Sequence, residues 1–489
     1  MTDQAQTTIV GQLPTPTETA SRVPRTLTRL VWLLWLVSLA AFVVRFRSAE
    51  PWTLPGLAVD GLTTVMWVTV TFFSGIVHSY SRRYMAGERA VDRFFWRVFA
   101  FTLIVMVLVA ADHLALFGLA WLAMGLVMAG LIGHVNGWPQ AEAAASLARR
   151  YFLASSASLA VAFLILWWDT GVTTVSDVAS AVDSSPAVLV AAGALLLAAM
   201  IQSALVPFHT WLLSSMTAPT PASALMHAGF VNAGGILLTR FAPVVTVDAG
   251  VMLVIVLVGA TSALLGKFLK TVRPDIKSKL GCSTVGQMGF MIVQAGLGFF
   301  GAAVTHLILH GFYKAYQFLA SGSRVEHRSP TGTTGDGTGP LGFVVVVLTA
   351  LAGGALFATL TGKGEGSGLL LTLLVVLTVL QAARGVVGRA DLPAAIRYGG
   401  VPLVALPALA VYAGIYRLIE GALAGLPAVG QPVALTPVHG LVAAAFVVAY
   451  LAIESGVYRH SERLYVALLN ASQPTSDTLL TTTEEYNEY

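Results

Sequence analysis

Residues 305–314 read Thr-His-Leu-Ile-Leu-His-Gly-Phe-Tyr-Lys and place three proton-binding side chains inside an apolar run. His306, His310 and Lys314 are spaced i, i+4 and i+8, so on a helix all three lie on one face. The apolar run continues to about Ser321, which makes it long enough to cross a bilayer. Because ionisable side chains inside a membrane are costly and usually functional, the stretch predicts a membrane helix with a proton or ion path along it.

The composition of the whole chain indicates a membrane protein with many spans. Hydrophobic residues make up 56% of the 489 residues, charged residues only 11%, and the mean hydropathy is +0.77. Soluble domains carry about 25% charged residues. The net charge of +4 does not indicate nucleic-acid binding, because the basic residues lie in short segments between apolar runs.

The residue inventory also excludes several kinds of chemistry. Cys282 is the single cysteine, which rules out an intramolecular disulfide and a cysteine-cluster metal site. The sequence contains no nucleotide-binding glycine fingerprint and no Walker lysine, so we do not expect the chain to hydrolyse ATP. We therefore expect a transporter subunit rather than an enzyme, with no cofactor and no metal in this chain.

The hydropathy profile predicts an all-α polytopic fold with roughly fourteen transmembrane helices. The predicted spans are 28–46, 57–79, 95–111, 113–134, 150–168, 186–207, 219–241, 249–270, 279–298, 301–322, 341–361, 367–387, 399–418 and 438–458. Residues 1–26 are polar and rich in Thr and Pro, which predicts a disordered cytoplasmic leader. The apolar run after Arg29 could instead be a signal-peptide core, but the many spans that follow favour a first membrane helix.

The charges of the connecting loops predict the orientation of the chain. Loops with clustered Lys and Arg alternate with loops that lack them; the basic positions are Arg22, Arg25, Arg82, Arg83, Arg89, Arg93, Arg149, Arg150, Lys270, Arg273, Lys277, Lys279, Arg324, Arg328, Arg384, Arg389 and Arg397. The intervening loop 169–185 carries Asp but no Lys or Arg. By the positive-inside rule, this pattern predicts a multi-pass protein of the plasma (inner) membrane with both termini in the cytoplasm, including a tail at 461–489.

Two predicted spans contain features that interrupt helices. The sixth contains Gln202 and Pro207 at depth, and the eleventh contains a glycine pair at 353–354 followed by Lys363. These two spans are five helices apart, so equivalent helices would run in opposite directions. Interrupted helices at matching positions indicate inverted repeats with a hydrated functional site between them.

Several longer motifs occur in a fixed order between about residues 55 and 370. They are Val59-Asp60-Gly61-Leu62, Val77-His78, Tyr84-Met85, Ala111-Asp112-His113-Leu114, Trp121 to Gly133, Pro207-Phe208-His209-Thr210-Trp211, Ala218 to Ala228, Asp275-Ile276-Lys277, Ser283 to Gly289, His306 to Lys314 and Ala320 to Ser323. Together they resemble the antiporter-like proton-channel subunits of respiratory complex I, specifically the large L-type subunit. The resemblance implies two inverted five-helix repeats, here 93–245 and 247–390, each with a half-channel at a broken helix. Further membrane helices would flank them at 27–80 and 397–460.

Two hallmarks of that family are missing from the first repeat. The family has Trp-Glu on the fourth span, where this chain has Trp121-Leu122, and a lysine at the position of Gln202. Neither Leu122 nor Gln202 can exchange protons in the usable pH range, and whether this half-channel conducts stays open. The second repeat keeps the family's titratable positions, which are His306, His310, Lys314, Lys363 and Glu365.

With these losses, and without the long lateral helix of the L-type subunit, the chain is similar to the membrane subunit of the two-component Dab-type inorganic carbon transporter. That resemblance implies a large soluble partner with a carbonic-anhydrase-like zinc site, so zinc is expected in the partner. The implied function is proton influx that powers uptake of CO₂ or bicarbonate. Protons are favoured over Na⁺ because charged His and Lys repel cations, although carbonyls of unwound backbone could still hold Na⁺.

Two other functions stay open from the sequence. The long motif match favours a proton-pumping subunit of a complex I-like NADH-quinone oxidoreductase or membrane hydrogenase, which the losses at Leu122 and Gln202 oppose. Alternatively, loss of the first half-channel favours a membrane anchor that holds a soluble enzyme without conducting ions.

All of the candidate residues except Glu365 also have a structural alternative. The predicted proton path consists of His306, His310, Lys314, Lys363, His227 and Gln202, with Glu365, Asp112, His209 and Asp275 in support. His306, His310 and Lys314 could form a buried polar cluster that only joins helices. Lys363 could extend from a helix end to the membrane–water interface. His227 could hydrogen-bond the irregular segment around Pro219, and Gln202 could hold water. Interfacial anchoring by His209 and Asp275, and helix capping by Asp112 and Asp60, are the alternatives for the remaining positions.

Overall fold

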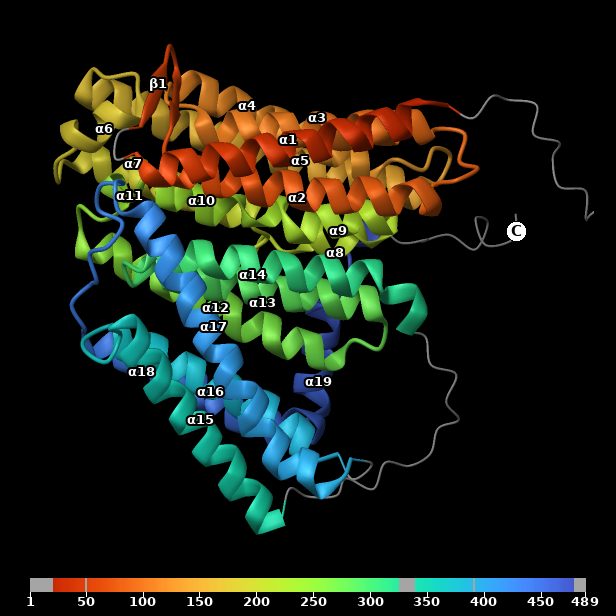
Figure 1. Cartoon of the computed structure of the whole chain (residues 1–489), viewed down its shortest axis with the longest axis vertical. Helices are drawn as coiled ribbons and strands as arrows, with labels where there is room; N and C mark the ends of the chain where they lie inside the picture. Colours follow the sequence, from red (N-terminus) through yellow and green to blue (C-terminus); the bar gives the residue numbers. More distant parts are fainter. Residues whose placement is uncertain (1–20, 49–50, 325–338, 390–391, 479–489) are drawn as a thin grey trace, which may run out of the picture.

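The computed structural model describes residues 21–48, 51–324, 339–389 and 392–478, which form a helix bundle with one short β-hairpin (Figure 1). The longer elements are α1 (Val23–Arg47), β1 (Trp52–Leu54), β2 (Leu57–Val59), α2 (Gly61–Tyr84), α3 (Val91–Ala110), α4 (Leu114–Ile132), α5 (Pro139–Thr170), α6 (Val175–Ala181), α7 (Pro186–Gln202), α8 (Thr210–Ser214), α9 (Thr220–Ala228), α10 (Ala233–Arg240), α11 (Ala242–Val245), α12 (Ala249–Val272), α13 (Ile276–Gly296), α14 (Phe300–Leu319), α15 (Gly339–Thr361), α16 (Gly368–Val387), α17 (Val401–Leu423), α18 (Pro437–Glu454) and α19 (Glu462–Ala471). Short helical turns are η1 (Ser215–Thr217), η2 (Phe230–Asn232), η3 (Ser321–Arg324), η4 (Ala395–Gly400), η5 (Val457–Arg459) and η6 (Ser476–Thr478).

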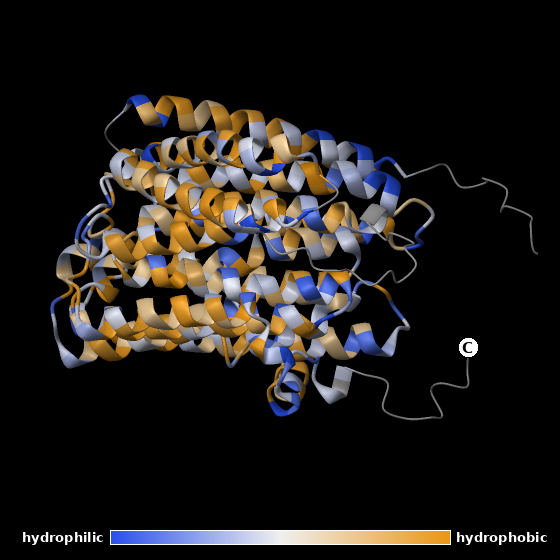
Figure 2. Cartoon of the chain, turned by 90° about the horizontal axis from the view of Figure 1, so that it is seen from below, coloured by the Kyte–Doolittle hydropathy of each residue, from blue (hydrophilic) through white to orange (hydrophobic). Residues whose placement is uncertain are grey.

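Every predicted span overlaps a helix or an interrupted helix of the structure. Within the described residues, 11 helical segments are long and apolar enough to cross a membrane, and α7 is apolar but shorter. Figure 2 shows apolar residues along the middle of the helices and many of the hydrophilic residues toward the two ends of the bundle. This is the architecture of a multi-pass integral membrane protein.

Several helices begin at residues other than those predicted, and two of these differences have a clear local cause. The second span was expected from residue 57, but residues 52–59 form the antiparallel pair β1 and β2, and α2 begins at Gly61. The side chain of Asp60 caps α2 by accepting a hydrogen bond from the Thr63 backbone at 2.8 Å. The fifth span was expected from residue 150, but α5 begins at Pro139, because the alanine-rich segment after this proline favours helix.

The sixth span is interrupted where the sequence predicted. α7 ends at Gln202, and the chain turns through residues 203–209 before the short helix α8. The seventh span, expected to be helical over 219–241, is also interrupted: α9 ends at Ala228, and α10 begins at Ala233. The side-chain amide of Asn232 donates to the carbonyl oxygen of Ala228 at 2.7 Å, so a side chain satisfies one of the freed backbone groups.

The eleventh span is interrupted later than its glycine pair suggested. α15 is continuous through Gly353 and Gly354 and ends at Thr361, where Gly362 adopts a positive φ of +71°. A Cβ on Gly353 would lie 2.6 Å from Leu409, and one on Gly354 would lie 2.4 Å from Val376. The glycine pair therefore permits close packing of α15 on its neighbours, and the break falls in the 362–367 connection to α16.

The described chain begins and ends at the same end of the bundle. The Ser21 hydroxyl donates to Asp92 at the start of α3 at 2.8 Å, and Tyr84 at the end of α2 donates to Thr220 at 3.2 Å. The Thr478 hydroxyl donates to Ser214 at 3.2 Å. Most of the predicted leader, the end of the predicted tail at 479–489 and the predicted basic residue Arg328 lie outside the described residues.

Helices α12 and α13 pack with their backbones in close contact. A Cβ on Gly266 would lie 2.3 Å from the backbone nitrogen of Gly286, and one on Gly289 would lie 2.3 Å from the backbone nitrogen of Ala263. Interfaces of this kind use small residues because association inside a membrane depends on close van der Waals contact. The contact matters for function because α13 holds side chains of the candidate site.

We expect Gly266→Ala to destabilise the protein, because the added methyl group meets backbone that cannot rotate away. Overpacking of this kind costs about 1–3 kcal/mol. The thermal midpoint of the purified protein in detergent measures the effect. Gly193→Ala on α7 is the matched control, because a Cβ there meets nothing within 4 Å. This substitution should leave the thermal midpoint unchanged or raise it. Equal midpoints for both variants would contradict the role of the α12–α13 contact.

A buried ion pair joins α2 to α10 at one end of the bundle. Arg240 donates to both carboxylate oxygens of Asp60 and, at 2.6 Å, to the backbone oxygen of Val109 at the end of α3. The side chains of Arg240 and Asp60 are 7% and 14% exposed, respectively. Burial alone would raise the pKa of Asp60, but the charge and hydrogen bonds of Arg240, with hydrogen bonds from Thr63, hold it below its usual 3.8.

Candidate functional site

Helix α14 carries the predicted ladder on a face that is buried in the bundle. Lys314 is completely buried, and His310 is 6% exposed. The rings of His306 and His310 lie nearly parallel, with centroids 6.0 Å apart, as expected for positions one helical turn apart. The ring of Phe290 on α13 covers His306 at 5.1 Å. The three titratable groups are therefore aligned along one helix and shielded by its neighbour.

Lys314 and His227 meet through α13, although they lie far apart in the sequence. The Lys314 ammonium donates to the backbone oxygen of Leu280 at 2.7 Å. The Thr284 hydroxyl also donates to this oxygen, at 3.0 Å, and lies 2.9 Å from Nδ1 of His227. We call these four residues the Lys314–His227 cluster. It joins α9 of the first predicted repeat to α13 and α14 of the second.

The hydrogen bonds of this cluster also assign a proton on His227. A threonine hydroxyl has one hydrogen, and here Leu280 accepts it, so Nδ1 of His227 must be the donor to Thr284. In the neutral ring, Nε2 then carries a lone pair and can accept a proton. The ring is completely buried and stacks on Phe318 at 4.4 Å, which fixes its orientation.

Several buried nitrogens of the site lack a hydrogen-bond partner within the described part of the chain. They are Nε2 of His227, Nε2 of His306, and both ring nitrogens of His310. Buried polar groups in folded proteins are almost always paired with protein or with ordered water. The four unpaired nitrogens lie on α9 and α14, at positions of the predicted proton path. That they exchange protons stays a prediction.

Gln202 lies at the last position of α7, where the sixth span is interrupted. Its side chain is completely buried, and neither of its amide atoms has a partner among the described residues. An amide cannot take up or release a proton at ordinary pH, but its donor and acceptor can orient water. The position therefore supports the water-holding interpretation better than a titrating one.

Trp121, next to the position of the missing carboxylate, takes part in hydrogen bonds that include no titratable group. The indole of Trp121 on α4 donates to the Ser155 hydroxyl on α5 at 3.1 Å, and Ser155 donates to the Ala198 backbone on α7 at 2.9 Å. The neighbouring Leu122 is only partly buried. These contacts join three helices of the first predicted repeat without supplying a proton carrier.

Lys363 lies in the connection after α15 and pairs with an acidic residue that the sequence analysis missed. Its ammonium is 3.4 Å from Glu420 on α17 and 4.6 Å from the ring centroid of Phe299. Glu420 also accepts from the Tyr416 hydroxyl at 2.9 Å. The signal for Glu420 was a carboxylate just beyond the predicted span 399–418, which in the structure lies inside α17.

Helix α14 separates the two lysines of the site. Phe299, against Lys363, immediately precedes the helix, and Lys314 lies near its far end. At 1.5 Å per residue the two positions are about 20 Å apart along the helix axis. His306 and His310 lie between them. The structure thus places four predicted path residues in sequence along the axis of α14: Lys363, His306, His310 and Lys314. His227 lies beside Lys314, at the end of this row.

Three of the four supporting residues, Asp112, His209 and Asp275, make structural contacts through their side chains. Asp112 accepts hydrogen bonds from the backbone and hydroxyl of Ser176, at 3.0 and 2.6 Å. His209 lies 3.1 Å from the backbone oxygen of Ala471 at the end of α19. Glu365 is exposed to solvent. These contacts agree with the anchoring interpretation for His209 and show that Asp112 joins the start of α4 to α6.

Asp275 caps α13 by accepting from the Ser278 backbone at 2.7 Å. Partial burial would raise the pKa of Asp275, but hydrogen bonds from Ser278 and the neighbouring Arg273 keep it below its usual 3.8. A carboxylate held in its charged form is a stable helix cap and a poor proton carrier near neutral pH. Among the described residues, no group of three or more His, Cys, Asp or Glu side chains is placed to hold a metal ion.

Sequence comparison with known proteins shows the family to which this chain belongs. A probable inorganic carbon transporter subunit, DabB, of Bacillus subtilis is 35% identical over 364 residues, which make up 72% of this chain and 71% of the relative. The chain belongs to the DabB family of antiporter-like membrane subunits. A family model described as NADH:quinone oxidoreductase/Mrp antiporter matches residues 111–339, and one for the N-terminus of complex I chain 5 matches residues 54–95.

Other relatives of this DabB family member match over a shorter part of their length. The probable inorganic carbon transporter subunit DabB1 of Halothiobacillus neapolitanus is 40% identical over 278 residues, 55% of this chain and 50% of the relative. NADH-quinone oxidoreductase subunit L of Mycobacterium tuberculosis is 37% identical over 276 residues, 55% of this chain and 43% of the relative. The chain thus spans about half the length of the first of these relatives.

Two solved structures share the fold. A chain of the Mrp complex from Dietzia has a TM-score of 0.55 and 23% identity, and the match covers 93% of this chain and 49% of the other. A chain of the membrane-bound sulfane sulfur reductase, an archaeal respiratory membrane complex, has a TM-score of 0.60 and 16% identity, covering 94% and 93%. The antiporter-like fold therefore extends over almost the whole DabB-type chain.

Proposed function

We propose that this chain is the cation-translocating membrane subunit of an energy-coupled inorganic carbon uptake complex. Its path carries protons through Lys314, His310, His306 and Lys363, with His227 and Gln202 at its junction with the first repeat. A large soluble partner with a carbonic-anhydrase-like zinc site converts or traps CO₂ or bicarbonate. This chain performs no catalysis, and both of its termini face the cytoplasm.

The observation that carries this proposal is the Lys314–His227 cluster. It contains a wholly buried lysine and a wholly buried imidazole with one unpartnered ring nitrogen, joined through one hydroxyl and one carbonyl. A lysine in such a setting exchanges its proton readily, whereas Na⁺ would need several oxygen ligands around one point. The similarity to DabB subunits supports inorganic carbon as the transported substrate.

The energy available from such a path is sufficient for uptake without ATP. Each charge that moves down the membrane potential releases about 2.3 kcal/mol per 100 mV. One or two protons per cycle could therefore drive a conformational change in the partner. Coupling of this kind needs a contact between the two proteins that has two stable arrangements. We expect the partner to bind at the basic end of the bundle, around Arg82 and Arg83.

The test is a mild-detergent pull-down of the tagged chain from its native membrane, with mass spectrometry of the partners recovered in stoichiometric amount. A large soluble zinc protein is the expected result. Co-expression of the two proteins should then allow host cells to grow at low CO₂ without added bicarbonate, and an uncoupler should abolish this growth. Recovery of quinone-linked redox or hydrogenase subunits, with no zinc protein, would refute the carbon uptake proposal.

The second candidate is a proton-pumping subunit of a complex I-like oxidoreductase or membrane hydrogenase. The observation that favours it is the 37% identity to an NADH-quinone oxidoreductase subunit L. Leu122 and Gln202 oppose it, because they remove the titratable groups of the first half-channel. The same pull-down decides between the two candidates.

A further inference from the structure

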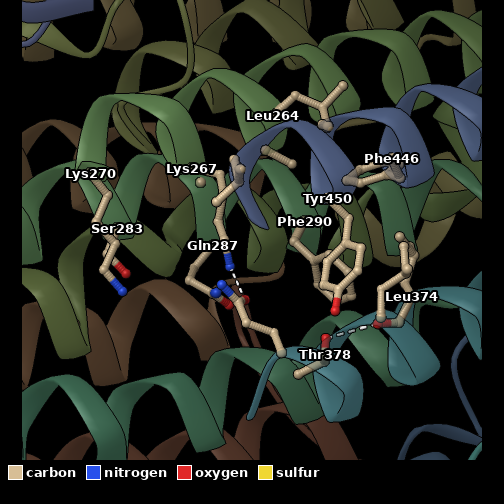
Figure 3. Close-up of a pocket in the computed structure, with 16 residues that line it drawn as sticks. Leu264, Lys267, Lys270, Ser283, Gln287, Phe290, Leu374, Thr378, Phe446 and Tyr450 are labelled. Carbon is tan, nitrogen blue, oxygen red and sulfur yellow. Dashed lines mark hydrogen bonds between the residues drawn. The ribbon is translucent and has the colours of Figure 1, made fainter. Parts of the chain in front are cut away.

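A cavity of about 150 Å³ lies between α12, α13, α16 and α18, apart from the Lys314–His227 cluster (Figure 3). A single buried water needs roughly 10–15 Å³, so the cavity has room for a ligand of several heavy atoms. The functions discussed so far do not use it.

Cationic and hydrogen-bonding side chains form one wall of this cavity. Lys267 and Lys270 project from successive turns of α12, and Ser283 and Gln287 face them from α13 (Figure 3). The Lys267 ammonium donates to the amide oxygen of Gln381 on α16. Because this contact engages the oxygen of Gln381, its amide nitrogen remains as a further donor at the cavity. The wall thus offers donors from three helices.

The positive charge of the cavity is not balanced by its lining. None of the described residues that line it is Asp or Glu. Glu454 lies nearby on α18, but it pairs with Arg384 at 3.1 Å. The opposite wall is apolar and includes Leu374, Leu377 and Phe446. Two partly buried lysines at one cavity repel each other, and an anion between them offsets that repulsion.

We propose that this cavity binds an oxyanion, held by Lys267 and Lys270 with hydrogen bonds from Ser283, Gln287 and Gln381. A carboxylate-like or phosphate-like group carries several acceptor oxygens, which match donors that converge from different helices. A free ion such as bicarbonate and the headgroup of an anionic lipid both present this chemistry. The proposal does not rest on the proposed transport function, because it concerns binding by this chain alone.

The position of the cavity connects it to the proton path. Phe290 lines the cavity and also covers His306 at 5.1 Å, so one ring separates the two sites. An anion bound in the cavity would therefore lie one aromatic ring away from the predicted proton path.

The experiment measures binding to the purified full-length chain in a neutral detergent, using sodium bicarbonate and then sodium phosphate as probes. Sodium chloride at equal pH and ionic strength is the reference. We expect at least one of the two oxyanions to raise the thermal midpoint of the wild type in a saturable way. Lys267→Gln and Lys270→Gln should each weaken the apparent affinity by about tenfold or more. Lys267→Arg, which keeps the charge, should restore most of it.

Controls separate this site from general anion effects and from lipid. Arg150→Gln removes an exposed charge on α5 and should bind as the wild type does. Native mass spectrometry distinguishes the source: a phospholipid that stays on the wild type and is lost from Lys267→Gln identifies a lipid headgroup. Unchanged ion affinity in both glutamine variants, together with unchanged lipid retention, would overturn the proposal. If the glutamine variants do not fold, loss of binding in the folded double variant Ser283→Ala/Gln287→Ala still supports it, and retained binding overturns it.

Discussion

Replacing Lys314 with methionine should lower ion-coupled transport by about a hundredfold, which is the lower end of what a positioned proton-transfer group contributes. Methionine is similar in length to lysine and fills the buried site without a titratable group. The Leu280 carbonyl keeps its hydrogen bond from Thr284, so the fold should survive. The readout is uncoupler-sensitive carbon uptake by cells that express this chain with its partner, normalised to the amount of folded complex.

Three further variants make this prediction specific. Lys314→Arg retains the positive charge but does not release a proton at physiological pH, so it should fail as completely as methionine. Arg149→Gln, at an exposed position of α5, should transport normally. Normal uptake by Lys314→Met would contradict the proton path. If the double variant Lys314→Met/Lys363→Gln also assembles and transports normally, the chain acts as an anchor for its partner.

The second large effect concerns the ion pair between Asp60 and Arg240. We expect Asp60→Asn to cost about 3–5 kcal/mol of stability, because it leaves the Arg240 guanidinium buried without its partner charge. Asparagine still caps α2, so loss of the charge is isolated from loss of the cap. The matched control is Asp248→Asn, which changes the cap of α12, where Asp248 accepts from Val251 at 3.0 Å. Thermal midpoints in detergent should fall steeply for the first variant and little for the second.

The pH dependence of this ion pair has a definite sign. The pKa of Asp60 is lower in the folded protein than its usual 3.8, so folding favours the charged carboxylate. Its contribution is therefore fully present above pH 3.8 and is lost as the pH falls below that value. The difference in midpoint between the wild type and Asp60→Asn should be constant from about pH 5 to 8 and should shrink below about pH 4. A difference that grew on acidification would contradict this assignment.

Sequence patterns predicted the membrane helices well because their signal is local. Bilayer thickness requires long apolar runs, and each predicted span meets a helix in the structure. Boundaries were less accurate where turn chemistry competes with hydropathy. Residues 57–59, predicted to begin the second span, belong to the hairpin at 52–59 instead. Helix α5 begins before its apolar run because alanines extend the helix.

The interruptions of helices were only partly predictable. Polar residues beside Pro207 marked the break after α7, but the break in the seventh span follows His227 without a proline at that point. The glycine pair at 353–354 indicated a break and instead packs against Leu409 and Val376. Glycine occurs both where a helix is interrupted and where two helices pack closely. The position of the neighbouring helices determines which of the two applies.

The sequence by itself determined that this protein is a membrane protein with His306, His310 and Lys314 on one face of a helix, because composition and spacing are properties of the chain. Only the tertiary structure decided what those groups meet. It brought His227 to Lys314 through Thr284, paired Lys363 with Glu420 and Asp60 with Arg240, and placed Lys267 and Lys270 at one cavity. These contacts join residues far apart in the chain, and they depend on how helices pack rather than on any pattern within one helix.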